Sequence, residues 1–317
     1  MAGEALIDTP PRADAGKAVR EFADRAVQLF IQFNALIVVA SVVMIFVFLI
    51  KESAPFFAHR SVGSLVAGRQ WYPLEPTEAF GALPLIAGTL VTTVIAVGIA
   101  LPLGILCAVF MGEVAEPRLK NVLKSTVEIL AGVPSVVIGF IGMSVVAPWL
   151  QVELGLLTGL TGFTGGLLLA LMALPTIISI SEDALHAVPQ EYRQASLALG
   201  CTKLQTIWRA VVPAARRGIV AALMLGIGRA IGETMTVLMA TGNAANVPQN
   251  LFAPIADNGL FMSMRTLTAT IAAEMGETPR ESLHYHALFA LGAVLFVMTF
   301  IINTVADFAF ARGRRDG

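Results

Sequence analysis

Six long apolar runs divide the chain, and each run is long enough to cross a membrane as a helix. A spanning helix needs about 20 mostly apolar residues. The six runs cover residues 27–50, 84–112, 126–148, 163–181, 216–241 and 286–310. The pattern therefore predicts six transmembrane helices, with two long polar loops at about 182–215 and 242–285 between them.

The composition agrees with a membrane protein. Hydrophobic residues make up 56% of the chain and charged residues 14%, whereas a soluble domain carries about 25% charged residues. The first apolar run is too long for the apolar part of a cleaved signal peptide, so we interpret it as a retained first span. The fold class that follows is an all-α membrane protein with six transmembrane helices.

The positions of the basic residues predict the orientation of the chain. If the N-terminus lies inside, 15 of the 21 Lys and Arg residues fall on the cytoplasmic side and 5 fall in outer loops. Cytoplasmic loops carry an excess of Lys and Arg, so both termini are expected in the cytoplasm. We expect a disordered tail at residues 1–20, the first transmembrane helix and outer loop at 21–70, and the main membrane domain at 71–312.

The inner loop has the features of a helix followed by a sharp turn. Pro189 is suited to the start of a helix and Gly200 to the residue after its end, and Tyr192 and Leu197 alternate with polar residues between them. Such a helix either protrudes into a groove of a partner protein or lies on the lipid surface. The pattern alone favours neither reading.

A charged pair interrupts the fifth apolar run. Arg229 lies about 13 residues from either end of this run, roughly 20 Å deep at a rise of about 1.5 Å per residue. Glu233 follows at a spacing of four residues, so a continuous helix would place both side chains on one face. One interpretation is an internal ion pair that locks two helices together. The other is that Arg229 faces a polar pathway and binds an anion, because its planar guanidinium matches tetrahedral oxyanions.

Several hydroxyl groups near this depth are candidate donors to the same anion. They are Thr234 and Thr236 on the fifth run, Thr89, Thr92 and Thr93 on the second, and Ser135 on the third. A single hydroxyl in a helix also often bonds to its own backbone. Phosphate near neutral pH carries a P–OH donor and sulfate carries none, so Glu233 has two candidate roles: an orienting partner of Arg229, or an acceptor that favours phosphate.

Other kinds of chemistry find no support in the sequence. No G-x-x-x-x-G-K-[ST] motif, H-E-x-x-H motif or C-x-x-C motif occurs, and Cys107 and Cys201 lie in different segments. His284 and His286 are two residues apart, which is a weak metal spacing. We expect no catalytic residues, no metal, no cofactor and no nucleic-acid partner.

The inner loop resembles a motif of ABC-importer permeases. In the stretch "QASLALG", Gln194, Ala195 and Ser196 stand at the E-A-A positions of the EAA-x3-G-x9-I-x-L-P loop, and Gly200 and Pro213 stand at its glycine and proline. The sequence departs from the motif at three positions, with Gln for Glu, Ala210 for Ile and Val212 for Leu. The resemblance implies a cytoplasmic coupling helix within residues 189–213 that docks on an ATPase subunit, with Glu191 and Arg193 adding polar contacts.

The stretches "GIGRAIGETMTVLMATGN", "FGALPLIAGTLVTT" and "LAGVPSVVIGF" resemble phosphate ABC-transporter permeases of the PstC type. This resemblance covers about residues 70–310 and implies a type I ABC-importer permease-like fold for the domain at 71–312. It also implies four kinds of partner: a second permease of the PstA type, a PstB-type ATPase dimer, a PstS-type extracytoplasmic phosphate-binding protein, and phosphate itself. The family's pathway arginine and glutamate correspond to Arg229 and Glu233.

Two further interpretations remain open at this point. The outer segment Met264–Met275 is helix-like with Leu267 and Ile271 on one side, and it is either a landing surface for the binding protein or a cap over the pore entrance. The alternatives for function are a permease for sulfate or molybdate, an ion-coupled secondary transporter that uses Glu233 as proton carrier, and a membrane scaffold.

Overall fold

The computed structural model describes residues 14–73, 78–247 and 259–311, and the chain divides into two units, residues 1–51 and 52–317. The first unit consists of most of helix α1 (Asp14–His59), whose last residues belong to the second unit. Residues 14–20 are helical, so that part of the predicted disordered tail is wrong, while residues 1–13 lie outside the described residues.

The prediction of six membrane-spanning helices is confirmed for the described part of the chain. Six helices there are long and apolar enough to cross a membrane: Asp24–His59, Leu83–Val114, Ser135–Leu154, Gly162–His186, Lys203–Gly232 and Leu283–Val305.

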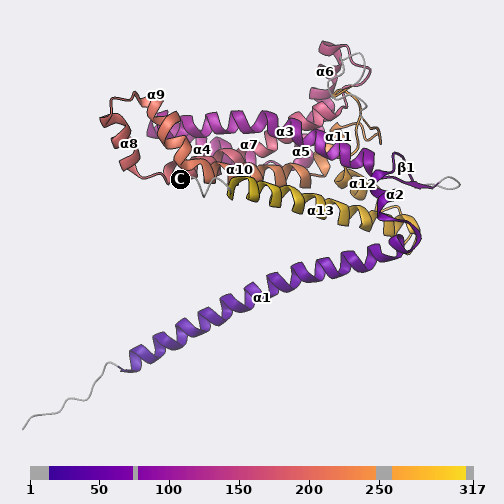
Figure 1. The fold of residues 1–317 in the computed structure, drawn as a ribbon, viewed down its shortest axis with the longest axis horizontal. Coiled ribbons are helices and arrows are strands. Elements are labelled where there is room, and N and C mark those ends of the chain that lie inside the picture. The colour runs from indigo at the N-terminus through magenta and orange to yellow at the C-terminus, as the bar shows by residue number, and fades with distance from the viewer. Residues whose placement is uncertain (1–13, 74–77, 248–258, 312–317) are drawn as a thin grey trace, which may run out of the picture. The chain divides into compact units, whose positions relative to one another are not determined.

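Four long helices run side by side through the second unit, and shorter elements join them (Figure 1). The long ones are α3 (Leu83–Val109), α7 (Gly162–His186), α10 (Val212–Gly232) and α13 (Leu283–Ala311). The short ones are α2 (Val62–Ala67), α4 (Pro117–Ala131), α5 (Ser135–Ile141), α6 (Ala147–Leu154), α8 (Gln190–Ala198), α9 (Lys203–Thr206), α11 (Met235–Ala240) and α12 (Leu267–Glu274). Three π-helical turns continue or connect them: η1 (Phe110–Val114), η2 (Gly142–Val146) and η3 (Ile207–Val211).

The second unit has two distinct ends (Figure 1). Helices α8 and α9 lie at one end, which we call the α8 end, and α2, α12 and the β-hairpin lie at the other, which we call the α12 end. The hairpin pairs β1 (Trp71–Tyr72) with β2 (Ala79–Phe80) in antiparallel register, with Trp71 opposite Phe80.

Small residues bring the long helices close together. Gly104 of α3 lies directly against Ile177 of α7, and Gly226 of α10 also lies against Ile177, so that a Cβ atom at either glycine would collide with this side chain. Buried alanines on α3 and α7 line the same contact. Such small residues let helices in a membrane approach closely. This packing fixes α10, which carries Arg229, against α3 and α7.

The third predicted span was misplaced. Residues 126–131 belong to α4, a separate helix with no buried residue, and the spanning helix begins only at Ser135. Gly132 ends α4 and Pro134 lies at the N-cap of α5. Proline restricts the residue before it to an extended backbone, so the chain turns between the two helices and does not continue through Pro134 as predicted.

The fifth predicted span is also interrupted. Helix α10 ends at Gly232, and Glu233 has an extended backbone with φ −71° and ψ 135°. The chain becomes helical again at Met235 in α11. Arg229 and Glu233 therefore do not share one face of a continuous helix, and this part of the sequence interpretation is wrong.

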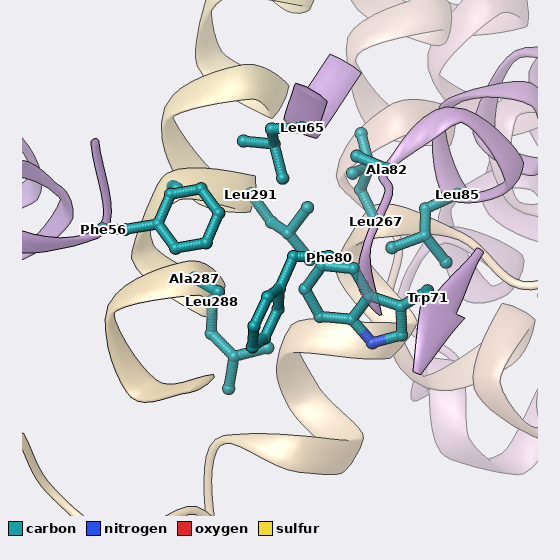
Figure 2. Packing of buried hydrophobic residues seen from close by; sticks show 11 residues of the cluster. Phe56, Leu65, Trp71, Phe80, Ala82, Leu85, Leu267, Ala287, Leu288 and Leu291 are labelled. Atoms are coloured by element: carbon teal, nitrogen blue, oxygen red, sulfur yellow. The ribbon is translucent and has the colours of Figure 1, made fainter. Parts of the chain in front are cut away.

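An apolar core fills the α12 end (Figure 2). Side chains from the end of α1, from α2, the hairpin, α3, α12 and α13 meet there: Phe56, Leu65, Trp71, Phe80, Ala82, Leu85, Leu267, Ala287, Leu288, Ala290 and Leu291. Leu267 is fully buried, and Ile271 and Met275 pack against the same core. The apolar side of this segment therefore faces the interior, which contradicts its predicted use as a landing surface for another protein.

Candidate functional site

The break after α10 leaves Arg229 in the last turn of a helix with its side chain exposed. Among the described residues, no carboxylate forms an ion pair with Arg229. The carbonyl end of a helix attracts a positive charge, so the position stabilises the guanidinium without neutralising it. A cation with open hydrogen-bond donors is therefore presented at the edge of the bundle.

Glu233 is held by groups on two neighbouring helices. Its backbone oxygen accepts a hydrogen bond of 2.8 Å from the Thr268 hydroxyl of α12. Its Oε1 atom accepts a long hydrogen bond of 3.4 Å from the backbone N–H of Thr236 in α11. The carboxylate is half-buried and retains acceptor capacity, because a carboxylate has about four lone-pair sites.

Four of the six predicted hydroxyl residues fall into two groups, one buried and one half-buried. Thr89 and Thr92 are buried, and their hydroxyls donate to the carbonyl oxygens of Leu85 and Gly88 in their own helix, both at 2.8 Å. Thr234 and Ser135 are half-buried near the helix break. The structure thus places the hydroxyls of the second group, and not those of the first, where solvent reaches them.

Thr93 and Thr236 have different surroundings. The Thr93 hydroxyl is buried and has no hydrogen-bond partner among the described residues. Thr236 is also buried, and its hydroxyl donates to the backbone oxygen of Ser135 at 3.0 Å, which ties α11 to the start of α5.

The sequence interpretation missed the threonines of α12. Thr266 caps this helix: its hydroxyl accepts from the backbone N–H of Ala269 at 3.2 Å. The hydroxyl oxygens of Thr266 and Thr268 are 3.1 Å apart and form a hydrogen bond. The Thr268 hydroxyl in turn donates to the backbone oxygen of Glu233. The signal was the alternating "TLTAT" in the outer loop, which places hydroxyls at regular spacing in a segment that turns out to be buried.

The second predicted site lies at the α8 end. Helix α8 begins after Pro189, and Gly200 follows its end with a φ of +80°, as the sequence predicted. Glu191, Gln194 and Ala195 are exposed, Ser196 is half-buried, and its hydroxyl lies 3.0 Å from that of Thr206. The exposed fractions of Leu197 and Leu199 are 51% and 86%. Pro213 lies in the first turn of α10 and is exposed.

Arg193 does not point away from the chain as a contact for an ATPase would. Its guanidinium forms an ion pair with Glu113 of η1, at 2.5 Å, and donates to the carbonyl oxygens of Val188 and Leu185 at 2.6 and 3.0 Å. The predicted role of Arg193 as an outward polar contact is therefore wrong, because its donors are used inside the chain.

A second polar cluster lies at the α12 end, around Glu274. Its carboxylate accepts hydrogen bonds from Trp71, from Arg265 at 2.5 Å and from the imidazole of His284 at 2.8 Å. Burial raises the pKa of Glu274, but the hydrogen bond from His284, the charge of Arg265 and the indole of Trp71 outweigh it and hold the pKa below its usual value. His286 instead lies 2.7 Å from the backbone oxygen of Glu52.

No group of three or more His, Cys, Asp or Glu side chains in the described part of the chain is arranged to hold a metal ion. The chemistry available at the two predicted sites is therefore that of guanidinium, carboxylate and hydroxyl groups.

Six helices that are long and apolar enough to cross a membrane, with a helix break beside Arg229 and an exposed α8, fit a membrane-embedded transport subunit. The family model described as binding-protein-dependent transport system inner membrane component matches residues 100–313. The chain belongs to this family, and it is a multi-pass membrane protein.

Individual relatives agree with the family. The chain is 37% identical over 268 residues to the phosphate transport system permease protein PstC of Mesorhizobium japonicum, with 78% of each chain covered. It is 38% identical over 280 residues to the probable ABC transporter permease protein YqgH of Bacillus subtilis, with 88% of each chain covered.

Solved structures share the fold at lower identity. A bacterial ABC transporter that imports the polysaccharide alginate matches with a TM-score of 0.57 at 14% identity, covering 93% of this chain and 99% of that one. The MetNI methionine ABC transporter in an inward-facing conformation matches with a TM-score of 0.52 at 20% identity, covering 72% of this chain and 92% of that one. These matches support the ABC-importer permease fold.

Proposed function

We propose that this protein is a transmembrane permease subunit of an ATP-driven importer of inorganic phosphate. The sequence relationship to the PstC permeases supports the substrate, and the family supports partners of two kinds, an ATPase and a binding protein. In this proposal the chain forms the pathway together with a PstA-type permease, receives motion from a PstB-type ATPase dimer and takes phosphate from a PstS-type binding protein. Hydrolysis of ATP takes place in the partner.

The observation that carries this proposal is the guanidinium of Arg229, which is exposed within an apolar stretch and has no ion-pair partner among the described residues. An arginine at the centre of a bilayer costs about 2.5–3.5 kcal/mol on insertion scales. Arginines are found at such a depth mainly where they face a water-filled route or a substrate. Arginine presents its donors in a planar fork that fits a phosphate oxygen pair, so Arg229 is the residue that binds the passing anion.

Glu233 is the acceptor that distinguishes phosphate from sulfate in this proposal. It forms no ion pair with Arg229, which removes support for a role as orienting partner, and its weak 3.4 Å hydrogen bond to Thr236 leaves lone pairs open. A P–OH group of phosphate donates to such an acceptor, whereas fully ionised sulfate has no hydrogen to donate. Thr234 and Ser135 supply donors to the remaining oxygens.

The orientation follows from the same proposal. The α8 end faces the cytoplasm, where the exposed apolar side chains of α8 dock on the ATPase, and both termini lie on this side. The α12 end faces outward toward the binding protein. The excess of basic residues in the loops on the α8 side supports this orientation.

Uptake of labelled phosphate into vesicles tests the proposal. The chain is reconstituted with its partner permease, ATPase and binding protein, and uptake is measured with and without ATP, for the native chain and for Arg229→Lys. Lysine keeps the charge but loses the planar fork, so we expect ATP-dependent uptake to fall about tenfold or more. Arg217→Lys, an exposed arginine on the same helix, is the matched control and should leave uptake unchanged.

Two results would contradict the proposal. Phosphate uptake by the native chain that is equally fast without ATP and ATPase would favour an ion-coupled transporter. Uptake that is selective for sulfate, with phosphate failing to compete, would favour a permease for another oxyanion.

Glu233→Gln is expected to weaken the preference for phosphate, so that sulfate becomes an effective competitor.

A further inference from the structure

The guanidinium of Arg193 joins three elements at the α8 end. It comes from α8, and its Nη2 and Nε atoms donate to the two carboxylate oxygens of Glu113 in η1, at 2.5 and 3.3 Å. The guanidinium also donates to the last turn of α7 and to the turn between α7 and α8. The acceptors there are the carbonyl oxygens of Leu185 and Val188. One side chain therefore connects α8 to the ends of both α3 and α7.

The local backbone prepares this arrangement. The end of α3 passes into the π-helical turn η1, which contains Glu113. The carbonyl oxygen of Leu185, in the last turn of α7, also accepts from the backbone N–H of Val188 at 3.3 Å. π-Helical turns are rare and often occur at functional sites. The exposed fractions of the Arg193 and Glu113 side chains are 14% and 10%, so the ion pair is shielded from solvent. Charged hydrogen bonds in such surroundings are stronger than exposed ones.

Few other contacts hold α8. None of its residues is buried, and the hydroxyl contact between Ser196 and Thr206 is its other described side-chain hydrogen bond to a neighbouring helix. The buried apolar cluster at this end includes Val109, Leu185 and Val211 from α3, α7 and η3, and none of its buried members belongs to α8. Without Arg193, α8 would keep this hydroxyl contact and its packing against η3 and α9, but would lose its ion pair to η1.

A second ionic contact stiffens the frame to which Arg193 is anchored. Glu182, buried near the end of α7, forms ion pairs with Lys120 and Lys124 of α4, at 2.5 and 3.2 Å. Helix α7 also packs along α3 and α10. The ends of α3, α4 and α7 thus form one connected body, and α10 with Arg229 lies against it.

We propose that Arg193 is a positioning residue that makes α8 move as one body with the ends of α3 and α7. The inference rests on the proposed function, in which an ATPase displaces α8. Through the Arg193–Glu113 pair that displacement reaches α3 and α7, and through their packing it reaches α10 and the helix break beside Arg229. Arg193 contacts neither the substrate nor the ATPase in this account.

The test separates phosphate uptake from ATP hydrolysis in the complete reconstituted transporter. The variants are Arg193→Gln, Arg193→Lys and Glu113→Gln, with Arg217→Gln as control. We expect Arg193→Gln and Glu113→Gln to keep the ATPase bound and hydrolysing, while phosphate transported per ATP falls about tenfold. Arg193→Lys keeps one ionic contact but not the fork and should lie in between. ATP-dependent uptake by the native chain checks the proposed function separately.

Hydrogen exchange provides a readout that does not depend on transport. Exchange of the backbone amides of α8 should become faster in Arg193→Gln and Glu113→Gln, while exchange in α12 stays as in the native complex. Unchanged exchange in α8 together with an unchanged ratio of phosphate to ATP would overturn the inference.

A cross-link tests the same point if these variants assemble poorly. In a chain with Glu113→Cys and Arg193→Cys, in a background with Cys107→Ser and Cys201→Ser, the two introduced thiols are bridged by a short bifunctional thiol reagent. If the two positions move together, bridging restores the ratio of phosphate to ATP toward the native value. If they must separate during the cycle, bridging abolishes uptake, and the inference is wrong.

Discussion

The α12 end and the α8 end of the bundle differ in how far their side chains are buried and paired within the chain. At the α12 end, Leu267 is fully buried in a shared apolar core and Glu274 is surrounded by three donors from three segments. At the α8 end, Leu199 is 86% exposed and α8 has no buried residue. Among the described residues, the Arg193–Glu113 pair is the ion pair that holds α8.

This difference separates the end whose apolar side chains are buried within the chain from the end where they are exposed. Apolar groups that are buried inside the chain stabilise its fold, whereas exposed clusters of large apolar side chains mark contacts with something else. The α12 end is therefore a closed structure in which substitutions affect stability. Helix α8 itself has no buried residue, so we expect substitutions of its exposed side chains to affect the contact with a partner and to have little effect on folding.

The largest expected effect is at the α12 end, for Gly88→Ala. A Cβ atom at Gly88 would overlap the backbone carbonyl of Arg265, and backbone cannot move aside as a flexible side chain does. We expect a loss of about 3 kcal/mol or more in the free energy of unfolding, measured by thermal unfolding of the purified complex. Gly98→Ala on the same helix has no atom within 4 Å of the new Cβ and should be neutral or stabilising. Equal stability of the two variants would contradict the account.

Substituting one leucine at each end compares their contributions to stability directly. Leu65 is fully buried in the core of the α12 end, and Leu65→Ala should cost about 2–5 kcal/mol of unfolding free energy. Leu199→Ala should change it by less than about 0.5 kcal/mol, yet weaken the binding of the ATPase. Thermal unfolding and copurification of the ATPase measure the two effects. If Leu65→Ala were as stable as the native chain, tight packing at the α12 end would be excluded.

The Glu274 cluster predicts a dependence of stability on pH. Because the pKa of folded Glu274 lies below the usual value of 4.5, its ionised form contributes stability above that value, and this contribution is lost as the pH falls through the folded pKa. At pH 7, Glu274→Gln should cost about 1.5–3 kcal/mol, the range for hydrogen bonds to charged groups. The difference from the native chain should shrink below about pH 4.5. Unfolding curves from pH 7 to pH 4 check this, with exposed Glu277→Gln as control, and a difference that does not vary with pH would exclude the mechanism.

A smaller loss of stability than at Gly88 is expected at Gly200, next to α8. Its φ of +80° is strained for a residue with a side chain, but a Cβ there has no atom within 4 Å. Gly200→Ala should therefore cost only about 1–2 kcal/mol, from backbone strain alone, and Gly200→Asn should cost less because asparagine tolerates this conformation. Thermal unfolding ranks the three chains, and a loss for Ala as large as that for Gly88→Ala would mean that the α8 end is packed after all.

The sequence predicted the features that depend on local chemistry. Runs of apolar residues predicted six spanning helices, and Pro189 and Gly200 predicted where α8 begins and turns. These follow from length, from the fixed φ of proline and from the freedom of glycine, which need no knowledge of the rest of the chain.

Breaks inside apolar stretches were not predicted. A single Glu233 or Pro134 within a mostly apolar stretch does not by itself mark the end of a helix, so the pattern predicts one continuous span in each case. The break at Glu233 depends on contacts from elsewhere, since Thr268 of α12 binds its backbone oxygen. The burial of Leu267 likewise depends on α13 and the hairpin, which lie far away in the sequence.

The inner role of Arg193 was missed for a similar reason. Its partner Glu113 lies 80 residues away in the sequence, and no local pattern connects the two. An amphipathic helix on a loop indicates that polar side chains face outward, and only the packed structure shows that one of them turns back to the bundle.

The central claim is that phosphate passes beside Arg229, and a cysteine at Gly232 tests it most directly. Gly232 lies one turn from Arg229, is exposed and has no atom within 4 Å of a built Cβ, so Gly232→Cys keeps the arginine intact. In the complete transporter, with Cys107→Ser and Cys201→Ser, we measure how fast a charged, water-soluble thiol reagent modifies this cysteine. Val94→Cys, on an exposed apolar strip of α3, is the control. The account predicts that Gly232→Cys is modified, that phosphate slows the modification more than sulfate does, and that Val94→Cys does not react. A Gly232→Cys that stays unmodified, or reacts at a rate that phosphate does not change, would contradict it.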